Sequence, residues 1–414
     1  VYWLRNDIRS VLGISTTSLT KSKNSGSCIY MEESRQWDES RLGWLTLSWN
    51  TGLSAMVKRR LYERFDRDGT KVAKINKQDL FAAGATPEAS ALFISWRSTA
   101  DADSFAARCE KDEVRLVLPW DDEFPKLLTT TAEPPACLFL RGAKLSLENS
   151  VAVVGTRRMT SYGRRATKEL TEGLATAGCT IVSGLALGID GVAHAAALDA
   201  GGRTVAVLGG GCDTATVYPV EHARLADRIA SGNGTVLSEM PPGTNCQKYH
   251  FLQRNRIIAG LSRALVVVEA PERSGALVTA KYALEESREV FVVPGPITNE
   301  QSRGTNAFLK YGAAPCTEPR DILETLGIEA ATVAVANLTA DEHALIAALD
   351  VPKYADDLCR ELKCPASTLS VTASSLELRG LLEREAGGTY TRTNRSVATI
   401  SFDKTPNHTY LHEH

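Results

Sequence analysis

The chain has 414 residues, 43% of them hydrophobic and 23% charged, with a formal net charge of −2. This length exceeds one ordinary domain, and the composition is typical of a folded globular chain rather than a disordered or fibrous one. No apolar run approaches the roughly 20 residues of a membrane-spanning helix, and the first residues lack a secretory pattern, so we expect a cytoplasmic protein without membrane contact. With so little net charge, a polyanion would have to be bound by a local basic patch.

The nine cysteines are scattered and include no Cys-x-x-Cys pair, which predicts reduced thiols rather than disulfides. The closest pair, Cys359 and Cys364, has no histidine nearby. Two such ligands do not make a metal site, so we expect neither a metal nor another cofactor.

Residues 1–40 carry many Ser, Thr, Asn and charged side chains without apolar periodicity, which predicts a disordered or non-native extension with Met31 as a candidate natural start. Over residues 41–110 apolar positions recur every three or four residues around Asn50-Thr51-Gly52. This pattern predicts a small helical domain that contains a helical hairpin, as in SAM-like domains. Such a hairpin can hold a DNA backbone through its glycine turn, although packing alone also explains the pattern.

After the connecting stretch 114–142, residues 151–312 contain six short apolar runs separated by stretches with helical spacing, several of which end at glycine. The runs are apolar throughout, as expected for strands that are covered on both faces. The repetition of strand and helix predicts a doubly wound, mostly parallel α/β sheet in a domain spanning residues 111–325. The six predicted strands are Val151–Val154, Thr180–Val182, Thr204–Leu208, Thr235–Leu237, Ala264–Val268 and Val290–Val293.

Residues 335–395 predict a winged-helix domain, and residues 396–414 a flexible tail. Three helical segments are followed by a predicted two-stranded wing at 380–383 and 387–390. Residues 339–392 hold 6 Lys and Arg against 9 Asp and Glu, a net of −3, and the third helix contains no Lys or Arg. Because a helix that reads DNA usually carries several cations, we interpret this domain as a protein-contact module.

The loop after the first parallel strand, Gly155-Thr156-Arg157-Arg158, combines a glycine, a hydroxyl and two cations before a helix start. Free N–H groups at such a start favour anions, so the loop predicts a phosphate cradle. It is neither a dinucleotide fingerprint nor a P-loop, because the glycine spacing of both motifs is missing.

Two further loops offer weaker candidates for chemistry. Asp190 and His194 share a helix face at i,i+4 after the loop that starts at Ser183, which is compatible with acid–base work. A structural hydrogen bond is the favoured reading, because no nucleophile accompanies the pair. Cys212, in the loop after the third parallel strand, has no base beside it in sequence and is not expected to be a nucleophile.

The segment 247–256 carries the most specific signal. It interleaves Lys248, Arg254 and Arg256 with two aromatic residues and Asn255. Cations that neutralise phosphates and rings that stack on bases are what an unpaired strand requires. A solvated helix with its aromatic side chains turned inward fits the composition equally well. A fifth loop, Ser274-Gly275-Ala276-Leu277, precedes a helix at the same predicted crevice.

Taken in order, these segments resemble the DNA-processing protein A family (DprA, also called Smf). The matching segments are Val153–Arg157, Ser183–Asp190 with His194, Ser238–Thr244, Arg254–Ser262, Ser274–Leu277 and Val293–Gly295. The resemblance covers about residues 42–392. It implies a small helical N-domain, an extended Rossmann-like domain that dimerises, and a winged-helix tail. It also implies binding of single-stranded DNA and loading of the RecA recombinase in natural transformation.

Carried over by position, the resemblance places a phosphate contact on Arg157, a lysine and a stacking ring on Lys248 and Phe251, and a basic helix start on Arg254 and Arg256. A further basic position maps less securely to Arg288. Thr156 replaces the usual serine, and Leu252 stands where many members have proline. The full expected nucleic-acid-binding set is Gly155, Thr156, Arg157, Lys248, Phe251, Arg254, Asn255, Arg256, Ser274, Gly275 and Arg288.

The resulting hypothesis is a non-enzymatic protein that coats single-stranded DNA and delivers it to a recombinase as a homodimer. The alternative is an enzyme that hydrolyses or senses a nucleotide-derived ligand on a related sheet. That reading gains from the phosphate cradle and from Asp190 with His194. A transcription regulator that uses the tail domain is disfavoured by the acidic balance of that domain.

Overall fold

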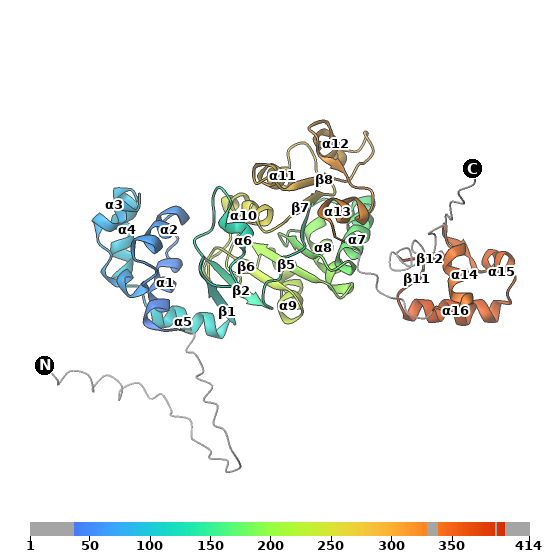
Figure 1. The fold of residues 1–414 in the computed structure, drawn as a ribbon, viewed down its shortest axis with the longest axis horizontal. Coiled ribbons are helices and arrows are strands. Elements are labelled where there is room, and N and C mark those ends of the chain that lie inside the picture. Colours follow the sequence, from blue (N-terminus) through green and yellow to red (C-terminus); the bar gives the residue numbers. More distant parts are fainter. Residues whose placement is uncertain (1–36, 329–337, 386, 394–414) are drawn as a thin grey trace, which may run out of the picture. The chain divides into compact units, whose positions relative to one another are not determined.

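The structure is a computed structural model that describes residues 37–328, 338–385 and 387–393. The predictions made for residues 1–36, including the start at Met31, and for the tail beyond residue 396 lie outside these ranges. Three groups of elements follow one another along the described chain (Figure 1): a helical group, a nine-stranded sheet with its helices, and a small winged-helix group. Among the described residues, no helix is long and apolar enough to cross a membrane.

The helical group begins at Glu39 and is built from short, well-capped helices. Side chains of Asp38, Ser54 and Thr86 accept hydrogen bonds from the first free N–H groups of α1, α2 and α4. The hairpin predicted around Gly52 is α1 and α2, and its turn is closed by the Asn50 side chain, which accepts from two backbone N–H groups. The elements are α1 (Glu39–Trp49), α2 (Ala55–Arg64), η1 (Gly69–Lys74), α3 (Lys77–Ala82), α4 (Pro87–Arg97) and α5 (Ala102–Lys111).

The six predicted parallel strands are all present, as β3 to β8, and run side by side in the order β6-β5-β4-β3-β7-β8. The connecting stretch holds two strands that the sequence analysis did not identify, β1 and β2, which extend the sheet in antiparallel fashion beside β6. The strands are β1 (Val114–Val117), β2 (Leu138–Gly142), β3 (Ser150–Val154), β4 (Thr180–Ser183), β5 (Arg203–Leu208), β6 (Thr235–Ser238), β7 (Ala264–Val267), β8 (Glu289–Val292) and β9 (Ala314–Pro315).

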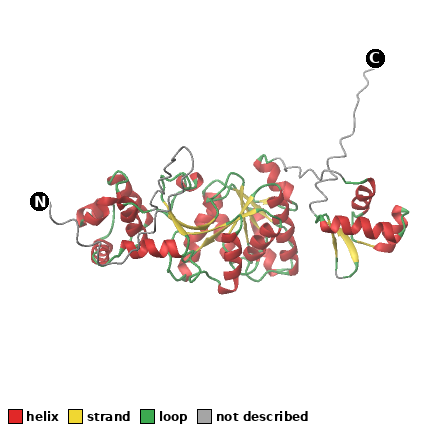
Figure 2. Cartoon of the chain, turned by 90° about the horizontal axis from the view of Figure 1, so that it is seen from below, coloured by secondary structure: helices red, strands yellow, loops and turns green. Residues whose placement is uncertain are grey.

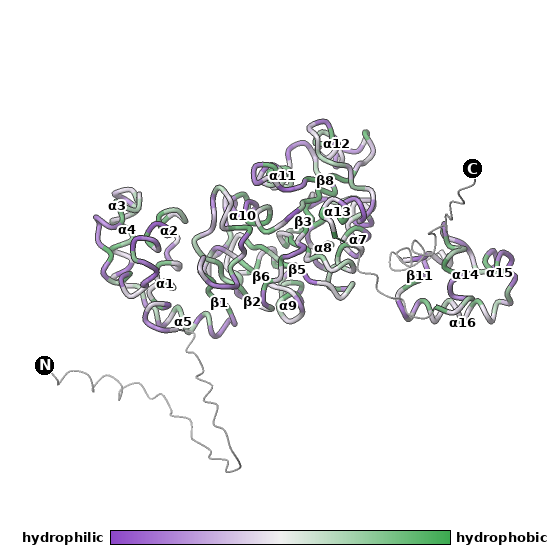
Figure 3. Tube along the Cα trace, in the orientation of Figure 1, coloured by the Kyte–Doolittle hydropathy of each residue, from purple (hydrophilic) through white to green (hydrophobic). Residues whose placement is uncertain are grey.

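Helices cover both faces of this sheet, as Figure 2 shows, so the architecture is a doubly wound α/β fold. Helices α7, α8 and α13 pack on one face, and α10, α11 and α12 on the other. The central strands are buried and hydrophobic (Figure 3). The helices and turns are α6 (Lys126–Thr129), α7 (Ser161–Thr176), α8 (Ile189–Asp199), η2 (Val220–His222), α9 (Ala223–Ser231), α10 (Lys248–Gly260), α11 (Gly275–Glu285), η3 (Glu300–Ser302), α12 (Arg303–Lys310) and α13 (Pro319–Leu326).

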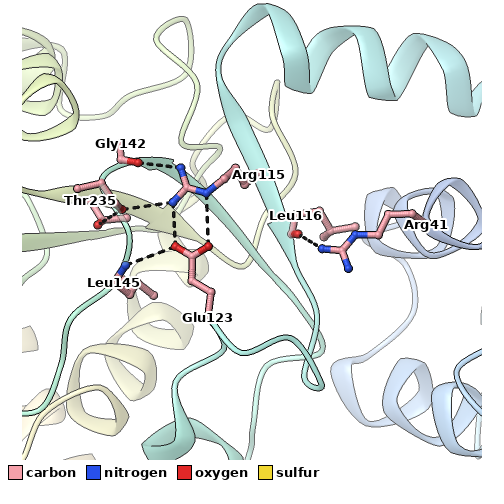
Figure 4. A network of polar contacts seen from close by, with 8 residues as sticks. Arg41, Arg115, Leu116, Glu123, Gly142, Leu145 and Thr235 are labelled. Atoms are coloured by element: carbon pink, nitrogen blue, oxygen red, sulfur yellow. Dashed lines mark hydrogen bonds and ion pairs between the residues drawn. The ribbon is translucent and has the colours of Figure 1, made fainter. Parts of the chain in front are cut away.

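The helical group shares its hydrophobic core with the edge of the sheet that β1 forms. The Arg41 guanidinium of α1 donates to the Leu116 carbonyl at 2.6 Å and pairs with Asp121 at 2.7 Å. Arg115, the neighbour of Leu116 on β1, pairs with Glu123 at 2.8 Å and donates to the Gly142 carbonyl (Figure 4). Apolar packing and the contacts of Arg41 therefore cross the domain boundary predicted at residues 110–111, whereas the contacts of Arg115 lie within the sheet domain.

The described C-terminal residues form the predicted winged helix, with its own core around Leu345, Leu358 and Leu376. A third short strand, β10, joins the two strands of the wing in the order β10-β12-β11. The elements are α14 (Ala340–Ala348), β10 (Lys353–Tyr354), α15 (Ala355–Leu362), α16 (Ala366–Leu378), β11 (Leu382–Arg384) and β12 (Thr389–Arg392).

Candidate nucleic-acid interface

The carboxyl ends of the six parallel strands β3 to β8 meet at one rim of the sheet, where their loops gather. Strand β4 lies on one side of β3 and β7 on the other, so the strand order reverses between β3 and β7. Ligands of open α/β sheets bind at such a reversal. The loop 155–160 after β3 and the loop 268–274 after β7 flank it, and α10 starts from the loop after β6.

Cationic and aromatic side chains meet at this rim. The Arg157 guanidinium carbon lies 5.1 Å from the centroid of the Phe251 ring, and Tyr218, on the loop after β5, lies 5.7 Å from the same ring. Lys248 is exposed and stands one turn before Phe251 on α10. Phe251 is partly exposed rather than sealed in the interior. We call Arg157, Tyr218, Lys248 and Phe251 the rim platform.

Sequence reasoning missed Tyr218, which is 52% exposed and belongs to the loop after β5. An aromatic residue in a glycine-containing loop at the end of a parallel strand was the available signal. Tyr249, beside Lys248, is 54% exposed, and its ring lies 4.3 Å from the ring of His250. Three exposed or half-exposed rings and two cations therefore share this part of the rim.

The predicted phosphate cradle at the start of α7 is already filled by a carboxylate of the chain itself. Buried Glu269, at the end of β7, accepts from the Thr160 amide at 2.8 Å and from the Thr160 hydroxyl at 2.6 Å. The Thr156 hydroxyl accepts from the Arg158 amide, and a Cβ on Gly163 would lie 2.1 Å from a Glu269 oxygen. The Thr160 amide is therefore not free for an outside anion, whereas Arg157 and Arg158 of the predicted loop are exposed and their phosphate contacts stay a prediction.

Arg254 and Asn255 are buried, so the structure does not present them to a ligand. The Arg254 guanidinium donates to the carbonyls of Gly184, at 2.7 Å, and Val207, at the ends of β4 and β5. A Cβ on Gly184 would lie 2.5 Å from that guanidinium, which explains the glycine. The Asn255 amide donates to the Gly275 carbonyl. These side chains support the rim from beneath, which corrects the expectation of direct contact.

Four expected residues remain. Arg256 and Ser274 make contacts within the chain, Gly275 is exposed, and Arg288 lies at the edge of the sheet opposite the rim. Arg256 is paired with Glu239 and donates to the Glu133 carbonyl, so its charge is neutralised within the chain. Ser274 caps α11 through its hydroxyl, and Gly275 is exposed with open space beside it. Arg288 precedes β8, whose four residues place it about 13 Å from the rim, at the opposite edge. The structure therefore does not bring Arg288 to the rim platform.

Asp190 and His194 serve the fold rather than acid–base chemistry. His194 is fully buried; its Nε2 accepts from the Leu185 amide, and its Nδ1 contacts the Thr204 hydroxyl at 2.6 Å. Because that hydroxyl donates to the Ile181 carbonyl, Nδ1 carries the proton and the ring is neutral. Burial lowers the pKa of His194 to about 3. Asp190 accepts a hydrogen bond from the Gly184 amide. Burial raises the pKa of Asp190, and the positive charge of Arg254 offsets part of this rise.

Cys212 and possible metal ligands are the other reactive groups considered in the part of the chain that the structure describes. Burial raises the pKa of the Cys212 thiol, which makes it a poor nucleophile. The described residues contain no group of three or more His, Cys, Asp and Glu side chains that could hold a metal ion. Asp190 and His194, the pair that favoured the enzymatic alternative, are engaged in structural hydrogen bonds.

The fold and the rim define a Rossmann-like α/β protein with a winged-helix module and an exposed cationic and aromatic surface. Comparison with known proteins identifies the family. The family described as DNA recombination-mediator protein A matches residues 115–327, just over half of the chain, and the DprA winged helix domain matches residues 318–388. The chain belongs to the DNA recombination-mediator protein A family.

Two curated relatives show the extent of the likeness. Protein Smf of Escherichia coli is 49% identical over 213 residues, which cover 51% of this chain and 56% of that protein. The DNA processing protein DprA of Bacillus subtilis is 44% identical over 206 residues, covering 49% of this chain and 68% of that protein. The matched segment thus spans between about half and two thirds of these relatives.

One solved structure supports the same assignment. The X-ray structure of DprA from Streptococcus pneumoniae is 34% identical, with a TM-score of 0.59, and the match covers 70% of this chain and 98% of that chain. A DprA structure from Helicobacter pylori, described by its single-stranded DNA binding mode, is 31% identical with a TM-score of 0.47, covering 52% and 95%. The predicted combination of Rossmann-like sheet and winged helix is confirmed by these comparisons and by the fold.

Proposed function

We propose that the rim platform binds single-stranded DNA and that the protein protects this strand and delivers it to a RecA-type recombinase in natural transformation. The observation that carries the DNA-binding part is the contact between the Arg157 guanidinium and the Phe251 ring, with Lys248 and Tyr218 beside them. Delivery to a recombinase rests on membership of the family alone. That the protein is not an enzyme and works in the cytoplasm remain predictions.

The composition of the platform suits an unpaired strand better than a duplex. Rings stack on exposed bases with about 1–3 kcal/mol each and without reading sequence, whereas the bases of a duplex are already stacked on one another. Arg157 and Lys248 are exposed and form no ion pair with another described residue, so both charges are available to phosphates. Affinity should therefore fall with salt, since each phosphate contact releases a counterion.

The homodimer predicted for the Rossmann-like domain also remains a proposal. Exposed large apolar side chains on the part of the chain from α11 to α12 are compatible with it, because Leu284, Ile297 and Tyr311 are 50%, 86% and 82% exposed. Exposed apolar side chains of this size mark interaction surfaces when they gather. Sedimentation that shows only monomers at micromolar concentration would contradict the dimer but not the proposed DNA site.

A salt titration of single-stranded and double-stranded DNA binding tests the proposed function. The variants Arg157→Ser and Lys248→Ser should each weaken single-strand binding and make the salt slope shallower by about 0.7. Arg203→Ser is the matched control, because Arg203 is exposed and begins β5, at the edge of the sheet opposite the rim. If both rim variants bind like the unaltered protein at low salt, the rim platform is not the DNA site.

A further inference from the structure

Helix α7 carries a row of cations that the rim platform does not use. Arg158 lies in the loop before the helix, and Arg164 and Arg165 stand in its first two turns. All three are exposed, as is Arg157. None of these four arginines forms an ion pair with another residue that the structure describes. A set of exposed, unneutralised guanidinium groups so close in sequence is a concentrated positive charge in a chain with net charge −2.

The surface around these arginines is hollowed on both sides of Arg165. A shallow depression of about 520 Å³ lies toward the start of the helix, and a second of about 230 Å³ lies between α7 and the end of β8. The first is lined by Met159, Thr160, Ser161, Arg164, Arg165 and Lys168. The second includes Tyr162, whose ring is partly exposed and whose hydroxyl donates to the Pro294 carbonyl.

The row of arginines has a defined beginning and end. It begins at Arg157, which belongs to the rim platform, and α7 itself is anchored there by the bonds between Glu269 and Thr160. It ends where acidic residues begin on the helix, because Lys168 pairs with Glu172 at 3.8 Å and Glu169 is engaged elsewhere. From Ser161 to Arg165 the helix rises about 6 Å. The α7 row, meaning Arg158, Arg164 and Arg165, is thus short and continuous with the platform.

We propose that the DNA strand bound at the rim platform continues along α7, where the α7 row contacts its phosphates. This inference rests on the proposed function and extends it to the path of the strand. A guanidinium group binds phosphate oxygens through two parallel hydrogen bonds, which suits arginine to this task. An acidic protein partner fits less well, because protein interfaces depend on buried apolar anchors and Met159 is the single hydrophobic residue among those that line the first depression.

Oligonucleotide length separates the α7 row from the rim platform. The double variant Arg164→Ser with Arg165→Ser is titrated by fluorescence anisotropy with oligothymidylates of about 5 and about 20 nucleotides, lengths that bracket common single-strand sites. We expect binding of the short strand to be unchanged, and binding of the long strand to weaken about tenfold with a salt slope shallower by about 1.4. Arg203→Ser with Lys144→Ser, two exposed cations at the edge of the sheet opposite the rim and without an ion pair to a described residue, is the matched control.

Each outcome has one meaning. If the double variant binds the long strand like the unaltered protein while Arg157→Ser loses both lengths, the strand does not follow α7 and the proposed function stands. Equal weakening of both lengths in the double variant also overturns the inference, because it indicates a general charge effect rather than a path. Absence of binding to either strand by the unaltered protein overturns the proposed function itself. Circular dichroism melting verifies that the variants are folded.

Discussion

Two helices, α7 and α10, start at the same rim of the sheet and pack on opposite faces, yet their first turns are built for different purposes. At α7 the amide and the hydroxyl of the N-cap residue Thr160 donate to the buried Glu269 carboxylate. At α10 the first turn leaves Lys248 exposed and brings Phe251 against Arg157. A glycine and arginines before a helix therefore do not by themselves make an anion site. Whether such a helix start can bind an outside anion depends on whether the chain already places a carboxylate of its own there.

The largest expected effect comes from removing the internal anion of α7. Glu269→Ala leaves the Thr160 amide and hydroxyl without their acceptor, so we expect a loss of about 3 kcal/mol in the free energy of unfolding. Urea denaturation followed by circular dichroism measures it. Glu272→Ala, an exposed carboxylate three residues away, should change stability by less than about 0.5 kcal/mol. Equal stability of the two variants would mean that Glu269 does not hold the start of α7.

The start of α10 is tested through its ring. Phe251→Leu keeps an apolar side chain but removes the stacking surface, so single-stranded DNA affinity should fall about 5- to 150-fold, the equivalent of about 1–3 kcal/mol. Stability should change little, because Phe251 is only partly buried. Fluorescence anisotropy measures the affinity, and Leu252→Ala, one position along the helix, is the control. Unchanged affinity of the Phe251→Leu variant would mean that the rim platform binds DNA through its charges and not through ring stacking.

The loop between β4 and α8 supports both helix starts, and its stability depends on pH. The Ile189 amide donates to the Thr156 carbonyl, and the Gly184 carbonyl accepts from Arg254. Burial lowers the pKa of the supporting His194 to about 3, against about 6.5 in an unfolded chain. The unfolded chain then binds more protons between these values, so stability falls as pH falls, by about 2 kcal/mol from pH 7 to pH 5.

Denaturation at the two pH values checks this effect. His194→Gln should remove most of the pH dependence, whereas His343→Gln in α14 should retain it. The same pH dependence in His194→Gln and in the unaltered protein would assign it to other groups.

The smallest effect is expected at a cation of α10 that the chain neutralises. Arg256→Gln removes a guanidinium already paired with Glu239, so affinity for single-stranded DNA should change less than about threefold, with the salt slope unchanged. Arg157→Gln, measured in the same titration, should weaken binding and make the slope shallower. If Arg256→Gln reduces affinity as much as Arg157→Gln, the ion pair opens when DNA binds.

Much of the fold could be predicted, because its signals are local. The six parallel strands are continuous apolar runs, and the winged helix follows from three short amphipathic helices and a glycine turn. Strands β1 and β2 could not be predicted, because they are short and about 20 residues separate them, with α6 between. Their pairing with β6 depends on contacts that are distant in the sequence.

The candidate site was predictable only in part, for reasons of geometry. Arg157 and Phe251 lie almost a hundred residues apart, and only the resemblance to a family linked them before the structure placed them in contact. Arg254 has the composition of a ligand-binding residue, but helix orientation turns it toward carbonyls of the sheet. Glu269 at the end of an apolar run gave no sign that it faces α7. The predicted domain boundaries and the role of each rim residue remain proposals.

The contact between Arg41 and Leu116 has a consequence for handling shortened forms of the chain. Strand β1 is the last strand on its side of the sheet, and the helical group shields it. The opposite border ends in β9, a two-residue strand that closes with Pro315 and offers little to a neighbour. A fragment that starts at residue 112 would expose the unpaired side of strand β1. We therefore expect such fragments to self-associate through β1, which light scattering would detect, whereas the intact chain should not self-associate in this way.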